Sequence, residues 1–402
     1  MPITETKTSL WRLHGVRPLV LITVLGFTGF AATLASLPWW AVQGGASQAA
    51  AGLVTTVMLA VTVATQFSVP AVVRRVGVGR TLAAGLVLLG APSPLYVLSH
   101  DLLPMVAVSA VRGIGFGVLT VVGSTLTAML APPGRHGELV GLYGLAIAVP
   151  NLLVVPGGVA LAQNVGFWPV AILATLPVVA APLALAEGNE RPKVRSEPSG
   201  GRQAYIASLA PSVVLLAVTL AGGGVLTFVP IERPDGFVAT ATLTLMSASA
   251  GLCRWRVGAL ADRVGTRVLL PVSVLIGVVG LVLVAAGLGW SSSALLLVGG
   301  AVFGISYGAV QNLTLVIAVA RVGRESAATA SAVWNASFDT GTAIGAVVVG
   351  ALAGLGTGVA GALLVTAVVL GVTAPFGRTM TQARRGSAAA EEPDVSLRRG
   401  AA

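Results

Sequence analysis

The chain has 402 residues, of which 55% are hydrophobic and only 9% are charged. Ordinary globular domains carry about 25% charged residues, so this composition excludes a soluble protein, which would have far too little polar surface. The formal net charge of +10 would suit a nucleic-acid-binding protein, but the basic residues are spread over short loops and are not clustered among aromatic side chains, as a phosphate-binding patch requires.

Apolar runs of about 20 residues recur along the chain, which is the length that an α-helix needs to cross a bilayer. We therefore expect an all-α membrane protein with twelve transmembrane helices. The predicted spans lie near 19–41, 49–72, 81–98, 103–130, 139–162, 167–186, 206–230, 237–257, 268–288, 292–319, 326–351 and 357–376.

The longest polar segment between spans, residues 187–205, divides the chain into two halves of six spans each. Its Pro, Gly and mixed charges are typical of a flexible linker. The predicted organisation is a cytoplasmic N-terminal segment (1–18), an N-terminal six-helix bundle (19–186), this cytoplasmic linker, a C-terminal six-helix bundle (206–377) and a disordered cytoplasmic tail (378–402).

The basic residues predict the orientation in the membrane. All of the 24 lysines and arginines except Arg112 and Arg233 fall on one side of the predicted spans, which places both termini in the cytoplasm. The first 18 residues show no cleaved signal peptide. Cys253 is the only cysteine, so no internal disulfide is possible, and we expect neither a metal ion nor a cofactor.

One short charged loop between two spans is the most informative motif. It covers residues 258–267 and reads G-x-x-x-D-R-x-G-x-R, with the residues Gly258, Asp262, Arg263, Gly265 and Arg267. A weaker copy occupies residues 70–80 of the first half, where Arg74 replaces the acidic residue. Similar loops at matching places in two halves indicate an internal duplication, which predicts two pseudo-symmetric bundles and is typical of transporters.

Asp339 is the first candidate for a coupling group. It lies close to the centre of the eleventh predicted span, where a charged, unpaired carboxylate costs several kcal/mol. Burial disfavours the charged form, so such a group can load and release a proton. Asn335 is one turn away on the same face. The alternative is a permanently protonated, structural Asp that bonds to a neighbouring helix.

Arg112 is the only cation that the sequence places deep within a span. The same helix presents Thr120 and Ser124 on a similar face, which suggests the wall of a water-filled cavity. In the alternative interpretation, backbone carbonyls hold the Arg112 side chain in a structural role. A second polar stripe, formed by Tyr307, Gln311 and Thr314, predicts cavity lining from the tenth span, although Thr and Ser also bond to their own helix backbone.

These motifs together resemble the major facilitator superfamily over essentially all twelve spans. The 258–267 loop is similar to the loop between the second and third helices of each half in that family. Residues 112–117 resemble its fourth-helix motif, in which an arginine is linked to proton coupling. Residues 133–144 and 335–345 resemble bacterial efflux members. The resemblance implies that the 258–267 loop is a gate that braces against the other half, here near Glu138.

We therefore expect a proton-coupled secondary active transporter that exports a small organic compound, a drug or a metabolite, by alternating access. The alternative is a proton-coupled importer of a small solute, and a channel or a non-transporting receptor is a third, less favoured class. No hydrolytic or redox constellation predicts an enzyme. The expected partners are the substrate, protons and the lipid bilayer. We expect a monomer in the inner membrane of a bacterium.

Overall fold

A computed structural model describes residues 9–46, 48–99, 101–186, 198–233 and 237–375. All regular secondary structure in these ranges is helical. Lys7, residues 187–197 of the predicted linker and the predicted tail 378–402 lie outside the described residues.

The helices of the first half follow the first six predicted spans in order. The first span consists of two helices, α1 (Val16–Leu34) and α2 (Ser36–Gln43). The remaining elements are, in chain order, α3 (Gln48–Val76), α4 (Val78–Gly90), the 3-10 helix η2 (Ser93–Val97), α5 (Leu102–Leu130), α6 (His136–Asn164) and α7 (Phe167–Ala186), and a short 3-10 helix, η1 (Leu10–Arg12), precedes α1.

The second half repeats this pattern. Its first helix begins at Pro198, inside the predicted linker 187–205, so residues 198–205 are helical. Its elements are α8 (Pro198–Glu232), α9 (Phe237–Val264), α10 (Thr266–Gly289), α11 (Ser293–Val322), the 3-10 helix η3 (Arg324–Ser326), α12 (Ala327–Leu352), the π-helical turn η4 (Ala353–Thr357) and α13 (Gly358–Val372). Helix α9 ends later than the predicted eighth span, at Val264 rather than near residue 257.

Ten stretches in the described residues are long and apolar enough to cross a membrane. The number differs from the twelve predicted spans for two reasons. Residues Arg324–Val372, which include α12 and α13, form one continuous stretch. Helix α9 is not among the ten, because it carries arginines and several Thr and Ser residues.

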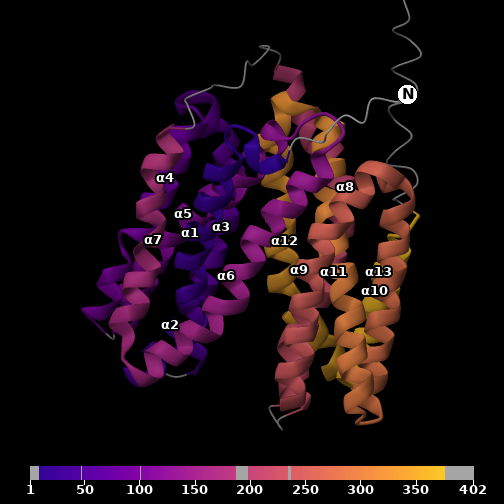
Figure 1. Ribbon diagram of the computed structural model, residues 1–402. Coiled ribbons are helices and arrows are strands. Elements are labelled where there is room, and N and C mark those ends of the chain that lie inside the picture. The colour runs from indigo at the N-terminus through magenta and orange to yellow at the C-terminus, as the bar shows by residue number, and fades with distance from the viewer. Residues whose placement is uncertain (1–8, 47, 100, 187–197, 234–236, 376–402) are drawn as a thin grey trace, which may run out of the picture.

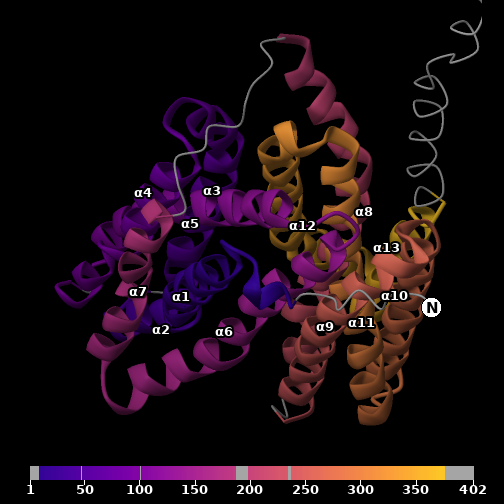
Figure 2. The ribbon, with the colours of Figure 1, turned by 45° about the horizontal axis from the view of Figure 1, so that its top comes forward.

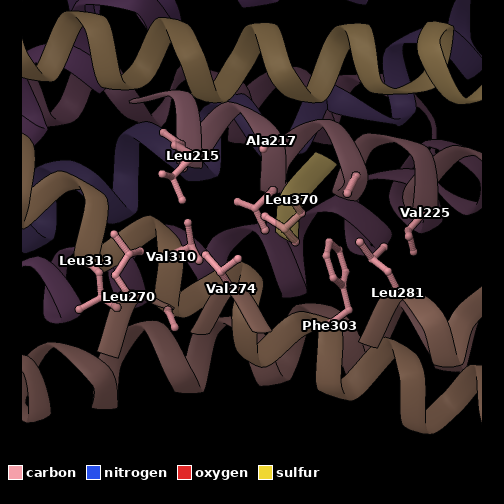
Figure 3. Packing of buried hydrophobic residues seen from close by; sticks show 14 of the residues in the cluster. Leu215, Ala217, Val225, Leu270, Val274, Leu281, Phe303, Val310, Leu313 and Leu370 are labelled. Carbon is pink, nitrogen blue, oxygen red and sulfur yellow. The ribbon is translucent and has the colours of Figure 1, made fainter. Parts of the chain in front are cut away.

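The helices pack in two groups. Helices α1–α7 contact mainly one another and form the N-terminal helix group, while α8–α13 form the C-terminal helix group. Figures 1 and 2 show the first group in indigo to magenta and the second in pink to yellow. Apolar side chains fill the interior of the C-terminal group, and Figure 3 shows part of this core: Leu215 and Ala217 of α8, Leu270 and Val274 of α10, Phe303 and Leu313 of α11, and Leu370 of α13.

The outer surface is also apolar. Val272, Leu275 and Val279 on α10, for example, are 46%, 55% and 52% exposed. Water would disfavour such a surface, whereas the hydrocarbon of a bilayer accommodates it.

The two charged loops share one backbone conformation. Gly77 precedes α4 with φ 96° and ψ 162°, and Gly265 precedes α10 with φ 89° and ψ 150°. Only glycine adopts this positive-φ conformation without strain. The likeness supports the internal duplication that the sequence indicates, even though the first loop lacks the acidic residue.

The two helix groups meet at one end of the molecule. Helix α6 lies against α9, and α12 lies against α3 and α5. The groups contact each other where α9 ends and α6 begins, and their ribbons separate toward the lower end of Figure 1. The residues that join the groups are therefore the ones to consider for function.

Candidate functional site

A hydrogen bond between the two helix groups places Asp339 at their interface. Gln66 of α3 donates from Nε2 to Asp339 Oδ2 of α12 at 2.7 Å. The same Nε2 donates to Thr120 Oγ1 of α5 at 3.2 Å. Gln66 and Thr120 are buried, while Asp339 is partly exposed. One amide thus holds the carboxylate against the opposite group.

Asn335 makes a second connection one turn earlier on α12. Its Nδ2 donates to Ser124 Oγ of α5 at 3.0 Å, and it lies 3.3 Å from the carbonyl oxygen of Thr120. It also bonds to the carbonyl of Ser331 on its own helix, at 2.8 Å. The structure therefore brings four predicted site residues, Asp339, Asn335, Thr120 and Ser124, into one polar cluster with Gln66.

This Asp339 cluster lies near mid-depth. At 1.5 Å per residue, Asp339 is about 18 Å from the start of α12, and Thr120 and Gln66 are each about 15 Å from the C-terminal ends of α5 and α3. The hydrocarbon core is about 30 Å thick. No Lys or Arg lies within 4 Å of Asp339 in the described part of the chain. The carboxylate is therefore not neutralised by an ion pair in the described part of the chain, and its role in proton exchange stays a prediction.

A second charged residue, Arg254 of α9, lies at the same interface, and the sequence analysis assigned it to the loop side of its span. It is only 7% exposed. Its Nη1 donates to Gln311 Oε1 of α11 at 2.8 Å, and its guanidinium carbon lies 5.8 Å from the centre of the Trp334 ring of α12. The side chain also touches α6, since a Cβ added at Gly144 would collide with it.

An aromatic cluster of α11 and α12 lies beside Arg254. The Trp334 and Phe338 rings of α12 stack with centroids 6.0 Å apart, and Tyr307 of α11 lies 6.3 Å from Phe338. Trp334 Nε1 donates to Thr314 Oγ1 at 3.0 Å. Of the predicted cavity residues of α11, Gln311 bonds to Arg254 and Thr314 bonds to Trp334. The third, Tyr307, is partly exposed.

Arg112 lies apart from both of these polar sites. It is fully buried in the N-terminal helix group, where it donates to the carbonyl of Gly29 on α1 at 2.8 Å and lies 5.4 Å from the Tyr96 ring centre. It is about 12 Å along α5 from Thr120. Its contacts match the structural alternative, in which a backbone carbonyl holds the guanidinium, and its part in proton coupling stays a prediction.

The 258–267 loop connects the two groups through Asp262. Its Oδ1 accepts from the backbone N–H of Gly137 and its Oδ2 from that of Glu138, each at 3.0 Å. The carboxylate therefore caps the first turn of α6, where unpaired N–H groups and the helix dipole favour a negative charge. This is the place near Glu138 that the sequence indicated for the gate.

The other predicted gate residues have different surroundings. The Glu138 carboxylate pairs with Arg135 at 2.7 Å rather than with a basic residue of the loop. This hydrogen-bonded pair raises the pKa of Arg135. Arg263 and Arg267 have no hydrogen bond or ion pair within the described ranges, and Gly265 shapes the turn before α10.

Small residues let α6 and α9 pack backbone against backbone. A Cβ at Gly137 would collide with Gly258, and one at Gly258 would collide with the carbonyl of Gly137. A Cβ at Gly141 would meet the carbonyl of Trp255 at 2.6 Å. Two further cross-group bonds close the same end: Asn312 donates to the Gly137 carbonyl at 3.2 Å, and Arg324 donates to that of Ala131 at 2.6 Å.

Three residues of the site are not among the predicted site residues. The sequence places Gln66 in a polar stripe with Thr55 and Thr62 on the second span, but nothing in that periodicity shows that it reaches α12. For Arg254 and Trp334 the sequence offers two weak signals: a basic residue well inside a long helix, and a tryptophan one residue before Asn335. Within the described ranges, no group of three or more His, Cys, Asp or Glu side chains could hold a metal ion.

The comparison with known families decides the identity of the fold. The family model of the Major Facilitator Superfamily matches residues 19–346. The chain belongs to this superfamily. It is therefore a multi-pass membrane protein of a transporter family, and not an enzyme. No curated protein sequence matches the chain.

Solved structures share the fold at low sequence identity. A variant of the Escherichia coli fucose:proton symporter FucP matches with a TM-score of 0.74 and 15% identity, over 91% of this chain and 98% of that one. FucP in the outward conformation matches with a TM-score of 0.72 and 15% identity, over 91% and 98%. The human organic anion transporter MFSD10 matches with a TM-score of 0.70 and 15% identity, over 90% and 98%.

Proposed function

We propose that this chain is a proton-coupled secondary transporter that exports a small organic compound from the cytoplasm. Its twelve spans form two pseudo-symmetric six-helix bundles, which correspond to the N-terminal and C-terminal helix groups. Substrate binds between the bundles near the midplane and is exposed to each side in turn. The observation that carries the proposal is the Gln66–Asp339 hydrogen bond, because it joins the two bundles through a group that can be protonated.

The Gln66 amide can form a hydrogen bond with Asp339 in either protonation state of the carboxyl group. The ionised carboxylate accepts from Nε2. A protonated carboxyl group has an O–H to donate. Gln66 Oε1, which is buried and has no hydrogen-bond partner in the described part of the chain, can accept it once the amide rotates. Proton loading therefore changes how α12 is held against α3, which is the kind of local change that biases two states of a protein.

The conformation supports alternating access. The end at which Asp262 caps α6 is closed, and the ribbons of the two groups separate at the other end (Figure 1). With the basic loops in the cytoplasm, the closed end is the cytoplasmic one, in keeping with the likeness to FucP in the outward conformation. Closure of the opposite end and release of the Asp262 cap would give the inward-facing state.

A proton-coupled importer is the second candidate, because a similar fold serves in a fucose:proton symporter. The direction of proton flow separates the two. When a transported compound is added to the outside of proteoliposomes, an importer takes up protons together with it, whereas an exchanger releases protons from the lumen.

The test of the proposal uses purified protein in liposomes with an imposed pH gradient and a panel of labelled organic compounds. Asp339→Asn carries no ionisable group, so we expect it to lose concentrative transport and to retain downhill exchange of the same compound. Asp339→Glu should keep part of the coupling. Asp101→Asn, which removes an exposed carboxylate before α5, is the matched control and should behave as the parent.

The proposal fails if no compound in the panel moves faster through the protein than through empty liposomes. It also fails in its coupling step if Asp339→Asn concentrates a compound as well as the parent does. Asp339 would then be structural.

A further inference from the structure

We infer that Arg254 is the anchor of an anion-binding subsite, and that the cargo is an organic anion with one carboxylate and an apolar or aromatic body. The inference rests on the proposed transport function and names its substrate class. The argument starts from the Arg254 guanidinium, which has more hydrogen-bond donors than partners.

A guanidinium is always protonated and has five N–H donors. Among the described residues, the Arg254 guanidinium finds one acceptor: Nη1 donates to the neutral Gln311 Oε1, while Nε and Nη2 are buried and donate to none of them. No carboxylate of the described residues lies within 4 Å. A buried cation with unpaired donors is costly, and a carboxylate, which accepts two parallel N–H bonds from one guanidinium, supplies what is missing.

Arg254 has the position expected of a substrate-binding residue. It is about 15 Å from the C-terminal end of α9, at the same depth as the Asp339 cluster. It touches Gly144 of α6, Gln311 of α11 and Trp334 of α12, and therefore lies between the two helix groups. Arg112 also has unpaired donors, but its contacts Gly29 and Tyr96 both belong to the N-terminal group, so no cargo between the groups would reach it.

The aromatic cluster beside Arg254 indicates the rest of the cargo. Phe338 and Tyr307 are partly exposed, and Trp334 lies over the guanidinium. An aromatic or aliphatic body packs against such rings, while its carboxylate reaches Nε and Nη2. A dicarboxylate is disfavoured, since Asp339 lies at a similar depth and would repel a second negative charge.

The test measures binding of labelled 2-naphthoate to the purified full-length protein in lipid nanodiscs, with its neutral amide, 2-naphthamide, for comparison. The parent should prefer the carboxylate. Arg254→Gln should weaken naphthoate binding roughly 10- to 100-fold, the effect expected when a hydrogen bond to a charged group is lost, and should leave naphthamide binding within twofold. Arg254→Lys, which keeps the charge but not the two-pronged geometry, should be intermediate.

Arg256→Gln is the matched control, because Arg256 lies on the same helix but is exposed and stacks on Trp255 at 4.8 Å; it should not change binding. Equal affinity of the parent for naphthoate and naphthamide would overturn the inference even if Arg254→Gln failed to fold, and so would unchanged naphthoate binding in Arg254→Gln.

Transport of neutral compounds alone would reject the anion subsite and keep the proposed transporter. Arg254-dependent naphthoate binding without any transport would support the subsite and reject the transporter.

Discussion

Removal of the Asp262 carboxylate should open the closed end of the molecule. Asp262 accepts two backbone N–H bonds from the first turn of α6. The N-cap residue of that helix, Arg135, makes no capping bond with its own side chain. The cap therefore comes from the other helix group and exists only while the two groups are in contact.

The size of the effect follows from the cap. A capping side chain is worth about 0.5–2 kcal/mol, and a negative charge at a helix N-terminus adds roughly 0.3–1 kcal/mol. Asp262 is exposed, so the lower parts of these ranges apply. Asp262→Ala should destabilise the closed-end state by about 1–2 kcal/mol, so the ratio of closed to open molecules should fall by a factor of about 5 to 30. Asp262→Asn keeps one acceptor oxygen, so it should destabilise the closed-end state by an amount near the lower end of this range.

Distance measurements between spin labels check this prediction. In a Cys253→Ala background, labels at Pro133, before α6, and at Val264, the last residue of α9, report the separation at the closed end. The short-distance population should shrink in Asp262→Ala and remain in Glu325→Gln, which removes an exposed carboxylate from η3 near the same end. A closed-to-open ratio in Asp262→Ala within twofold of the ratio in the parent would refute the capping argument.

Three further predictions concern the orientation, the packing of α6 on α9 and the coupling site. In intact cells with Cys253→Ala, an impermeant thiol reagent should label a cysteine placed at Ser292 and not one at Ser199; the reverse would reject the orientation. Gly258→Ala puts a methyl group against the Gly137 backbone, so the same spin-label pair should show an opened end and transport should slow, whereas Gly289→Ala, where a Cβ meets nothing, should change neither. Gln66→Leu removes the amide that holds Asp339 and should lower concentrative transport more than downhill exchange in proteoliposomes; equal losses in both would point to a packing role alone.

Most of the helical architecture could be predicted from the sequence, because spanning helices need long apolar runs and their connections need polar turns. The turn before α10 was also predicted, since Gly265 takes a positive φ there. It is shorter than the predicted 258–267 loop, because residues 258–264 continue helix α9. The depth of Asp339 followed from counting residues within one span. Each of these inferences uses only local spacing along the chain.

The residues that sequence reasoning missed depend on contacts between distant segments. Arg254 was assigned to the basic cytoplasmic side, because the positive-inside pattern counts a basic residue near a span end as a loop residue. Helix α9 continues to Val264 and carries the arginine about 15 Å inward. The Gln66–Asp339 pair joins residues far apart in the chain, and periodicity shows only which face a residue occupies, not which helix it meets.

Helix α12 contributes residues to both charged sites, the one at Asp339 and the one at Arg254. It presents Asp339 and Asn335 to the N-terminal helix group and Trp334 to Arg254. In the proposed mechanism, a proton on Asp339 would change how α12 is held against α3, and an anion at Arg254 would change how α12 is held against α9 and α11. Two ligands that bias the same element are coupled, and the coupling of their binding free energies is reciprocal. If both sites act as proposed, the anion alters proton affinity at Asp339 by the same factor by which the proton alters anion affinity at Arg254, and proton-driven transport would use this coupling through α12.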